Sequence, residues 1–200
     1  MLKDILLKTA ELINRDDLID GLNNNNNSQS IQNDILRMIS YYNYTMETLC
    51  ENYFNLSTKQ IISSNNNKQI HYFNFTFKPT KILSVLKNNK NVFFSEYTKY
   101  ITVPESNNEY EIIYKFIPDR LSNMEDSICL PYGITEKMIC YGIAGEFLAS
   151  KSQLDKAEYW NNKFMFEIFK SKTRKDRKLK PTFTIWNQKQ SYFQILNMII

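Results

Sequence analysis

The sequence predicts an α+β protein with a helical bundle core, an inserted small antiparallel β subdomain and an extended C-terminal arm. Apolar residues recur every three or four positions near both ends of the chain, which is the spacing of amphipathic helices. Over residues 57–118 the spacing changes to two, which is typical of half-buried strands. The chain has 200 residues, of which 42% are hydrophobic. This length predicts one domain or two small ones, and the composition excludes a disordered chain.

The N-terminal region, residues 1–56, is predicted to be helical. The first helix is indicated by apolar residues at helical spacing: Leu2, Ile5, Leu6, Thr9, Leu12 and Ile13. A second short helical piece ends at Gly21, and a polar loop of asparagines follows at residues 23–28. A long helix begins near Ser30 and carries an apolar stripe: Ile31, Ile35, Met38, Tyr42, Met46, Leu49 and Tyr53. We interpret this stripe as a core-packing face.

Residues 57–118 are predicted to form about six short antiparallel strands. A hairpin is expected around the asparagines at 65–67, followed by alternation from Ile70 to Phe75. Further strands are expected at residues 82–86, 92–95, 100–103 and 109–117, with asparagine-rich turns between them. The last of these alternates most clearly, with one face formed by Tyr110, Ile112, Tyr114 and Phe116.

Residues 119–172 are predicted to complete the core with a helical hairpin. Thr135 is the expected N-cap of its first helix, after a polar linker. Gly142 and Gly145 lie in the middle of that helix, where each costs about 1 kcal/mol relative to alanine. Close approach of another helix is the expected compensation. After a turn at residues 150–152, the partner helix presents an apolar stripe: Leu154, Ala157, Trp160, Phe164 and Ile168.

The C-terminal segment, residues 173–200, is predicted to be a basic and aromatic arm, because the helical pattern fails past Arg174 and Pro181 stops any helix. The net charge of +4 is concentrated nearby, since residues 163–180 carry eight basic and two acidic side chains. Such a run attracts phosphate or an acidic protein face, although a solvated helix end is the simpler interpretation. The apolar residues that follow need a partner surface: the chain's own β layer or a neighbouring subunit.

No residue set in the sequence supports catalysis, a cofactor or a metal ion. The only histidine, His71, lies in an aromatic strand, where a structural role is favoured over that of a general base. The adjacent carboxylates at 16–17 and 125–126 do not face each other, so neither pair forms an acid/base dyad. Only four glycines are present, which leaves little room for a phosphate-binding loop. We therefore predict a protein that is not an enzyme.

The cysteines and the N-terminus bear on where the protein acts. Cys50, Cys129 and Cys140 lack metal-site or disulfide spacing and are expected to be buried free thiols. The N-terminal residues do not form a secretion signal, because charged residues interrupt the apolar ones. No apolar run approaches the ~20 residues that span a membrane. The protein is therefore expected to act without secretion and without membrane contact.

The order of the elements, together with the segment LPYGITEKMICYGIAGEFLASKSQLDKAEYWNNKF, resembles head–tail connector (adaptor) proteins of tailed bacteriophages, particularly those of Firmicute phages and prophages. That family combines a helical hairpin of the pattern LP…YGIA.E…A..W…F with a basic segment ending near a tryptophan. The matching residues are Leu130, Pro131, Tyr141, Gly142, Ile143, Ala144, Glu146, Ala157, Trp160, Phe164 and Trp186. The resemblance covers residues 1–187, and residues 188–200 have no counterpart.

This resemblance implies a structural virion protein of the neck, made in the host cytoplasm and located between capsid and tail. Such proteins form a ring, commonly of twelve copies, beneath the portal. The ring extends the channel through which DNA passes without sequence-specific binding, and it docks the next neck or tail component. The implied contact residues for a second subunit or the portal are Gly142, Gly145, Lys172, Arg174, Lys175, Arg177, Lys178, Lys180, Phe183, Ile185 and Trp186.

Two alternatives remain open on the sequence. The first is a tail-completion or terminator ring protein of the phage neck, which differs in contacting the tail tube in place of the portal. The second is a nucleic-acid-binding module that uses residues 163–189, in which aromatic side chains are interleaved with basic ones. The second alternative predicts binding that weakens steeply with salt.

Overall fold

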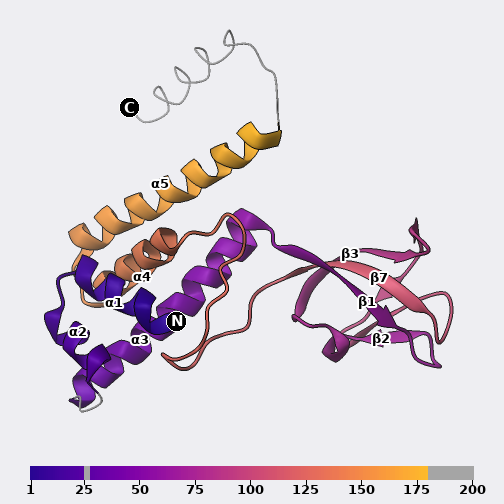
Figure 1. Ribbon diagram of the computed structural model, residues 1–200, viewed down its shortest axis with the longest axis horizontal. Coiled ribbons are helices and arrows are strands. Elements are labelled where there is room, and N and C mark those ends of the chain that lie inside the picture. Colours follow the sequence, from indigo (N-terminus) through magenta and orange to yellow (C-terminus); the bar gives the residue numbers. More distant parts are fainter. Residues whose placement is uncertain (25–27, 180–200) are drawn as a thin grey trace, which may run out of the picture.

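The computed structural model describes residues 1–24 and 28–179 and has the predicted α+β class. Figure 1 shows a helical part and a smaller β subdomain side by side along the long axis of the molecule. The helices are α1 (Leu2–Leu12), α2 (Asp16–Asn23), α3 (Gln29–Thr48), α4 (Glu136–Ser150) and α5 (Leu154–Leu179). The strands are β1 (Ser57–Ser63), β2 (Gln69–His71), β3 (Pro79–Lys87), β4 (Lys90–Asn91), β5 (Ser95–Glu96), β6 (Tyr100–Thr102) and β7 (Glu109–Phe116).

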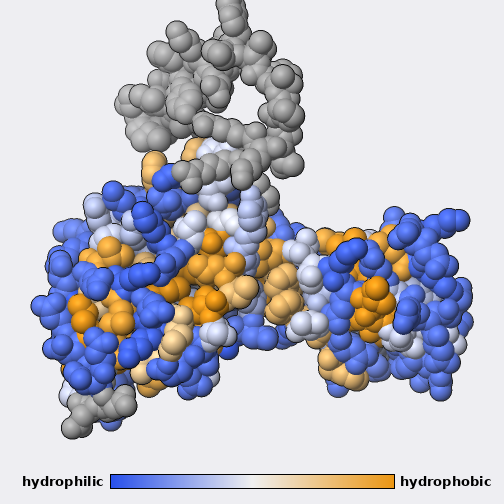
Figure 2. All heavy atoms as spheres, in the orientation of Figure 1, coloured by the Kyte–Doolittle hydropathy of each residue, from blue (hydrophilic) through white to orange (hydrophobic). Residues whose placement is uncertain are grey.

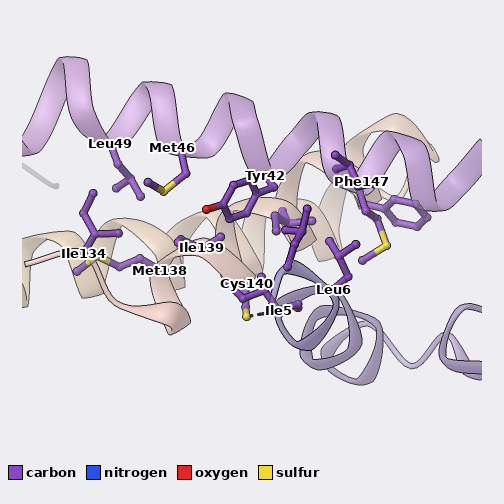
Figure 3. Close-up of a cluster of buried hydrophobic side chains, with 14 of the residues drawn as sticks. Ile5, Leu6, Tyr42, Met46, Leu49, Ile134, Met138, Ile139, Cys140 and Phe147 are labelled. Carbon is purple, nitrogen blue, oxygen red and sulfur yellow. Dashed lines mark hydrogen bonds between the residues drawn. The ribbon is translucent and has the colours of Figure 1, made fainter. Parts of the chain in front are cut away.

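The helical core forms where α4 packs against α1, α3 and α5. The apolar stripe predicted for the long helix is its central face, since Met38, Tyr42 and Leu49 are each at most 4% exposed. Figure 3 shows this face of α3 meeting Met138 and Ile139 of α4, with α1 beside them. The long helix ends in a π-helical turn, η1 (Leu49–Phe54), which the periodicity did not predict.

Side-chain caps fix where α3 and α4 begin. The Thr135 hydroxyl accepts a hydrogen bond from the Met138 N–H at the start of α4, as the sequence predicted. Ser28 does the same for the N–H of Ile31 at the start of α3. Gly21 lies inside α2 and does not end it, because that helix continues to Asn23.

The β subdomain contains two antiparallel sheets that share one hydrophobic core. The four-stranded sheet has the order β1-β7-β3-β4, and the three-stranded sheet has the order β2-β6-β5. Alternation in β7 is confirmed, because Tyr110, Ile112 and Tyr114 are at most 1% exposed. Residues Asn88 and Asn89 have positive φ angles of 50° and 61°, so they form a tight turn between β3 and β4.

The hairpin predicted around residues 65–67 is wrong, because β1 pairs with β7 whereas β2 pairs with β6. Strand β2 also ends at His71, since the next three residues form a 3-10 turn, η2 (Tyr72–Asn74). The Gln60 side chain explains this interruption. Its amide donates to the carbonyl of Asn74 and accepts from the N–H of Thr76, and it thereby replaces strand pairing for that segment.

The second helix of the hairpin is longer than predicted, since α5 continues to Leu179. Residues 173–179 therefore belong to a helix, whereas they were expected to begin an extended arm. This stretch contains arginine, lysine and leucine, which favour helix, and it contains no glycine or proline. Helix propensity therefore outweighed the loss of apolar periodicity. The rest of the predicted arm, residues 180–200, lies outside the described residues.

Candidate interaction surfaces

The predicted close approach of helices at Gly142 and Gly145 is confirmed, and it occurs within the subunit. A Cβ atom at Gly142 would lie 2.5 Å from Cγ2 of Thr45 on α3. A Cβ atom at Gly145 would overlap the side-chain amide of Asn161 on α5. Both glycines are buried. The chain's own helices occupy the space beside both glycines, so this packing accounts for them without a second subunit or the portal.

The inner face of α5 follows the predicted stripe with one exception. Ala157 and Ile168 are 4% and 2% exposed, and the Trp160 ring contacts Tyr141 of α4 with centroids 5.3 Å apart. Leu154 was expected in this stripe, but it is 68% exposed because it begins the helix beyond the end of the core. The spacing of the apolar hairpin residues is thus explained by packing between α4 and α5.

The outer face of α5 carries large apolar side chains in solvent, which the sequence analysis missed. Tyr159, Phe166 and Phe169 are 54%, 63% and 64% exposed. Their spacing of seven and three residues places them on one side of the helix, away from Ala157 and Ile168. The signal was available in the sequence as a second apolar stripe out of phase with the first. We call Tyr159, Phe166 and Phe169 the outer face of α5.

The basic end of α5 adjoins this face. The ammonium group of Lys172 lies over the Tyr53 ring, 4.9 Å from its centroid, and the Tyr53 hydroxyl contacts the sulfur of Met165. Arg174, Lys175, Arg177 and Lys178 follow within the helix. The remaining predicted contact residues, Lys180, Phe183, Ile185 and Trp186, lie outside the part of the chain that the structure describes.

A buried carboxylate joins three segments at the opposite end of the helical part. Asp34 is 5% exposed, and its carboxylate accepts hydrogen bonds from Lys151 at 2.7 Å and from Arg15 at 3.2 Å. Burial alone would raise the pKa of Asp34, but these two cations outweigh it and hold the pKa below its usual value. This cluster links α3 to the turns before α2 and after α4.

A groove of about 300 Å³ separates the helical part from the β subdomain. Asn43 lies at its polar edge. The Asn43 side chain accepts a hydrogen bond from the N–H of Leu121 and donates one to the carbonyl of Leu121. Arg120 forms a two-pronged ion pair with Glu47, at 2.6 and 3.1 Å. Burial raises the pKa of Tyr42, on the groove wall, to about 12. These contacts fix the linker between the two parts.

The thiols and paired carboxylates have structural surroundings. Cys50 and Cys140 are buried as predicted, and burial raises the pKa of each thiol to about 11. Cys129 differs from the prediction, because it is exposed beside the groove. Asp17 forms an ion pair with Arg15, and Asp126 accepts hydrogen bonds from two backbone N–H groups of its own turn. One member of each acidic pair therefore has a structural partner.

Residues 1–24 and 28–179 contain acidic side chains, cysteines and a histidine, which are possible metal ligands. No group of three or more His, Cys, Asp or Glu side chains in these ranges is arranged to hold a metal ion. None of the helices there is long and apolar enough to cross a lipid bilayer. Comparison of the chain with models of known protein families and with curated protein sequences finds no match.

Proposed function

We propose that this protein is a structural subunit of a tailed-phage head–tail connector, a ring of copies docked beneath the portal. The observation that carries the proposal is the outer face of α5. Three aromatic side chains stand in solvent there, next to the basic end of the same helix. Exposed aromatic residues beside positive charge are typical of protein interfaces. The described part of the chain ends with α5, at a point away from the helical core that this helix completes.

The distribution of charge over the helical part supports contact between copies. Residues 1–24 carry five acidic and three basic side chains, whereas residues 163–180 carry eight basic and two acidic ones. Figure 1 shows α2 and the C-terminal end of α5 at opposite ends of the helical part. Segments of opposite net charge favour head-to-tail contacts between copies, which close into rings when the rotation between copies permits.

The surface hydropathy is consistent with a subunit that has partners. In Figure 2 the hydrophobic residues on this side gather on the helical part and in the middle of the β subdomain, with hydrophilic residues around them. In a connector ring, the helical part would hold neighbouring copies together. The β subdomain projects from it and would be available to the portal or to the next neck component.

The test is the mass of the purified chain together with negative-stain images. The proposal predicts ring-shaped particles with a central channel, with a mass near twelve times that of the 23.8 kDa chain. A chain that stays monomeric at high concentration and does not bind a portal ring contradicts it.

The alternatives give different results in the same material. A tail-completion protein would bind the tail tube and leave the portal unbound. A nucleic-acid-binding module would lose DNA affinity when Arg174, Lys175, Arg177 and Lys178 are neutralised. If those changes block particle assembly and leave DNA affinity unchanged, the basic end of α5 is a protein contact.

A further inference from the structure

A row of four aromatic rings crosses the three-stranded sheet of the β subdomain. The rings of Phe73 and His71 stack, with centroids 5.1 Å apart and an angle of 21° between the ring planes. The His71 and Tyr100 rings meet edge-to-face with their centroids 5.6 Å apart, and the Tyr100 and Tyr97 rings stack with their centroids 5.0 Å apart. Phe73 is 81% exposed and Tyr97 is 51% exposed. The two ends of the row therefore stand in solvent, and packing within the subdomain does not account for it.

The register of the sheet separates this row from the hydrophobic core. Residues that oppose each other across strands, or lie two apart along one strand, share a face. Ile70 and Ile101 share the inner face and are fully buried. Glu96 pairs with Ile101, but its side chain is exposed and lines a hollow together with Tyr97, Lys99 and Tyr100. The outer face receives five side chains, none of them acidic: Gln69, His71, Ser95, Tyr100 and Thr102.

The β subdomain carries a net positive charge. Residues 57–118 carry eight lysines and four glutamates. Two of these lysines form ion pairs, with Glu111 and with Glu105. Lys68 and Lys99 directly precede β2 and β6, are exposed, and form no ion pair within the described ranges. Lys68 and Lys99, at the starts of β2 and β6, are thus available to a negatively charged ligand, although Lys99 lies beside the exposed Glu96.

We propose that the outer face of the three-stranded sheet binds single-stranded nucleic acid. Unpaired bases would stack on the exposed rings of Phe73 and Tyr97, while Lys68 and Lys99 contact the phosphates. Gln69 and its neighbours on the face supply donors and acceptors for base edges. In a duplex the base faces are covered by neighbouring pairs, so the platform prefers single strands. The surplus of lysines favours a polyanion over a neutral saccharide or an apolar peptide.

The test measures fluorescence anisotropy of a labelled 15-nucleotide oligothymidylate with the full chain. We expect binding that weakens as salt increases. The double substitution Phe73→Ala and Tyr97→Ala is expected to raise Kd at least about tenfold, because stacking on both exposed ends of the row is lost. Both side chains are exposed, so the fold is retained, which circular dichroism checks. The matched control is Phe93→Ala, which removes an 84% exposed ring outside the row and should leave Kd unchanged.

Four results would overturn the proposal. The first is no binding of the oligonucleotide at micromolar protein. The second is equal affinity of the wild type and the double variant. The third is binding that depends on Arg174, Lys175, Arg177 and Lys178 while the aromatic row has no effect. The fourth is preference for duplex DNA of the same length, or for a neutral dextran oligosaccharide. The proposal does not depend on ring assembly, because every measurement is made on the chain itself.

Discussion

At the scale of single residues, small side chains and buried charges decide how the helices of this protein approach one another. Gly142 costs helix stability, yet it lets α4 lie against Thr45 of α3. Asp34 is buried but has cations on two sides, so its charge is retained. The asparagines act at the same scale, since five of the seven non-glycine residues with positive φ among the described residues are asparagines.

Substitution of Gly142 tests the close approach of α3 and α4. Gly142→Ala is expected to destabilise the chain by about 1–3 kcal/mol, because the new methyl group overlaps Thr45. Denaturant unfolding measures the change. The double variant Gly142→Ala with Thr45→Ala should recover part of the loss, since it removes the overlapping atoms. Equal stability of Gly142→Ala and the wild type would mean that the helices are further apart than described.

Substitution of Asp34 tests the buried ion cluster. Asp34→Asn is expected to destabilise the chain by about 2 kcal/mol at pH 7, because charge-assisted hydrogen bonds from Lys151 and Arg15 are lost. The folded-state pKa of Asp34 is lowered, so its contribution is present above the unfolded pKa and disappears as the pH falls through the folded value. The variant should therefore lose less stability than the wild type between about pH 5 and pH 2. The exposed Asp20→Asn is the control.

Thiol reactivity tests the burial of the cysteines. At pH 8 one thiol, Cys129, is expected to react quickly with a thiol reagent, since it is exposed. Cys50 and Cys140 should react only after unfolding, because burial raises their pKa to about 11 and blocks access. Three fast-reacting thiols in the native protein would show that the helical core is open.

At the scale of helices and strands, apolar periodicity predicted which segments form helices and strands, but it did not predict which strands pair. The amphipathic helices, the N-cap at Thr135 and the alternation of β7 follow from local chemistry, so the sequence was sufficient for them. The pairing of β1 with β7 joins residues about fifty positions apart, and no local signal specifies it. The Gln60 contacts that interrupt the strand after His71 are equally non-local.

The candidate surface on α5 could be predicted only in part. The basic run was visible as composition, but its helical continuation to Leu179 depended on propensity and not on apolar spacing. The glycines were correctly expected at a close helix contact, yet sequence alone does not distinguish a contact within a chain from one between chains. The outer face of α5 was not predicted, because the inner apolar stripe alone was used to predict how this helix packs.

Substitution on α5 tests the proposed subunit contact. Phe166→Ser with Phe169→Ser is expected to reduce ring assembly, because both side chains leave the outer face while the inner stripe is untouched. The melting temperature of the dissociated chain should not fall, since exposed side chains contribute little to the fold. Leu36→Ser, on an exposed position of α3, is the control and should assemble normally. Assembly that is unaffected by the double variant would exclude α5 as the contact.

At the scale of the whole molecule, the chain has two hydrophobic cores, one among the helices and one between the two sheets. The chain enters and leaves the β subdomain at adjacent points, because the N–H of Phe116 donates to the carbonyl of Leu56. Replacing residues 57–117 by a short glycine–serine linker should therefore leave the helical part folded. Far-UV circular dichroism and cooperative thermal unfolding measure this. Loss of the helical signal would show that the two cores fold as one.

The central claim is that copies of this chain form a connector on the portal. The most direct measurement mixes the chain with the portal ring encoded in the same genome and determines the mass and composition of what co-elutes. The account predicts a stable complex that contains one portal ring and a ring of this chain, near twelve copies. Absence of any complex at concentrations where both proteins are soluble, or a complex with the tail tube in place of the portal, would contradict it.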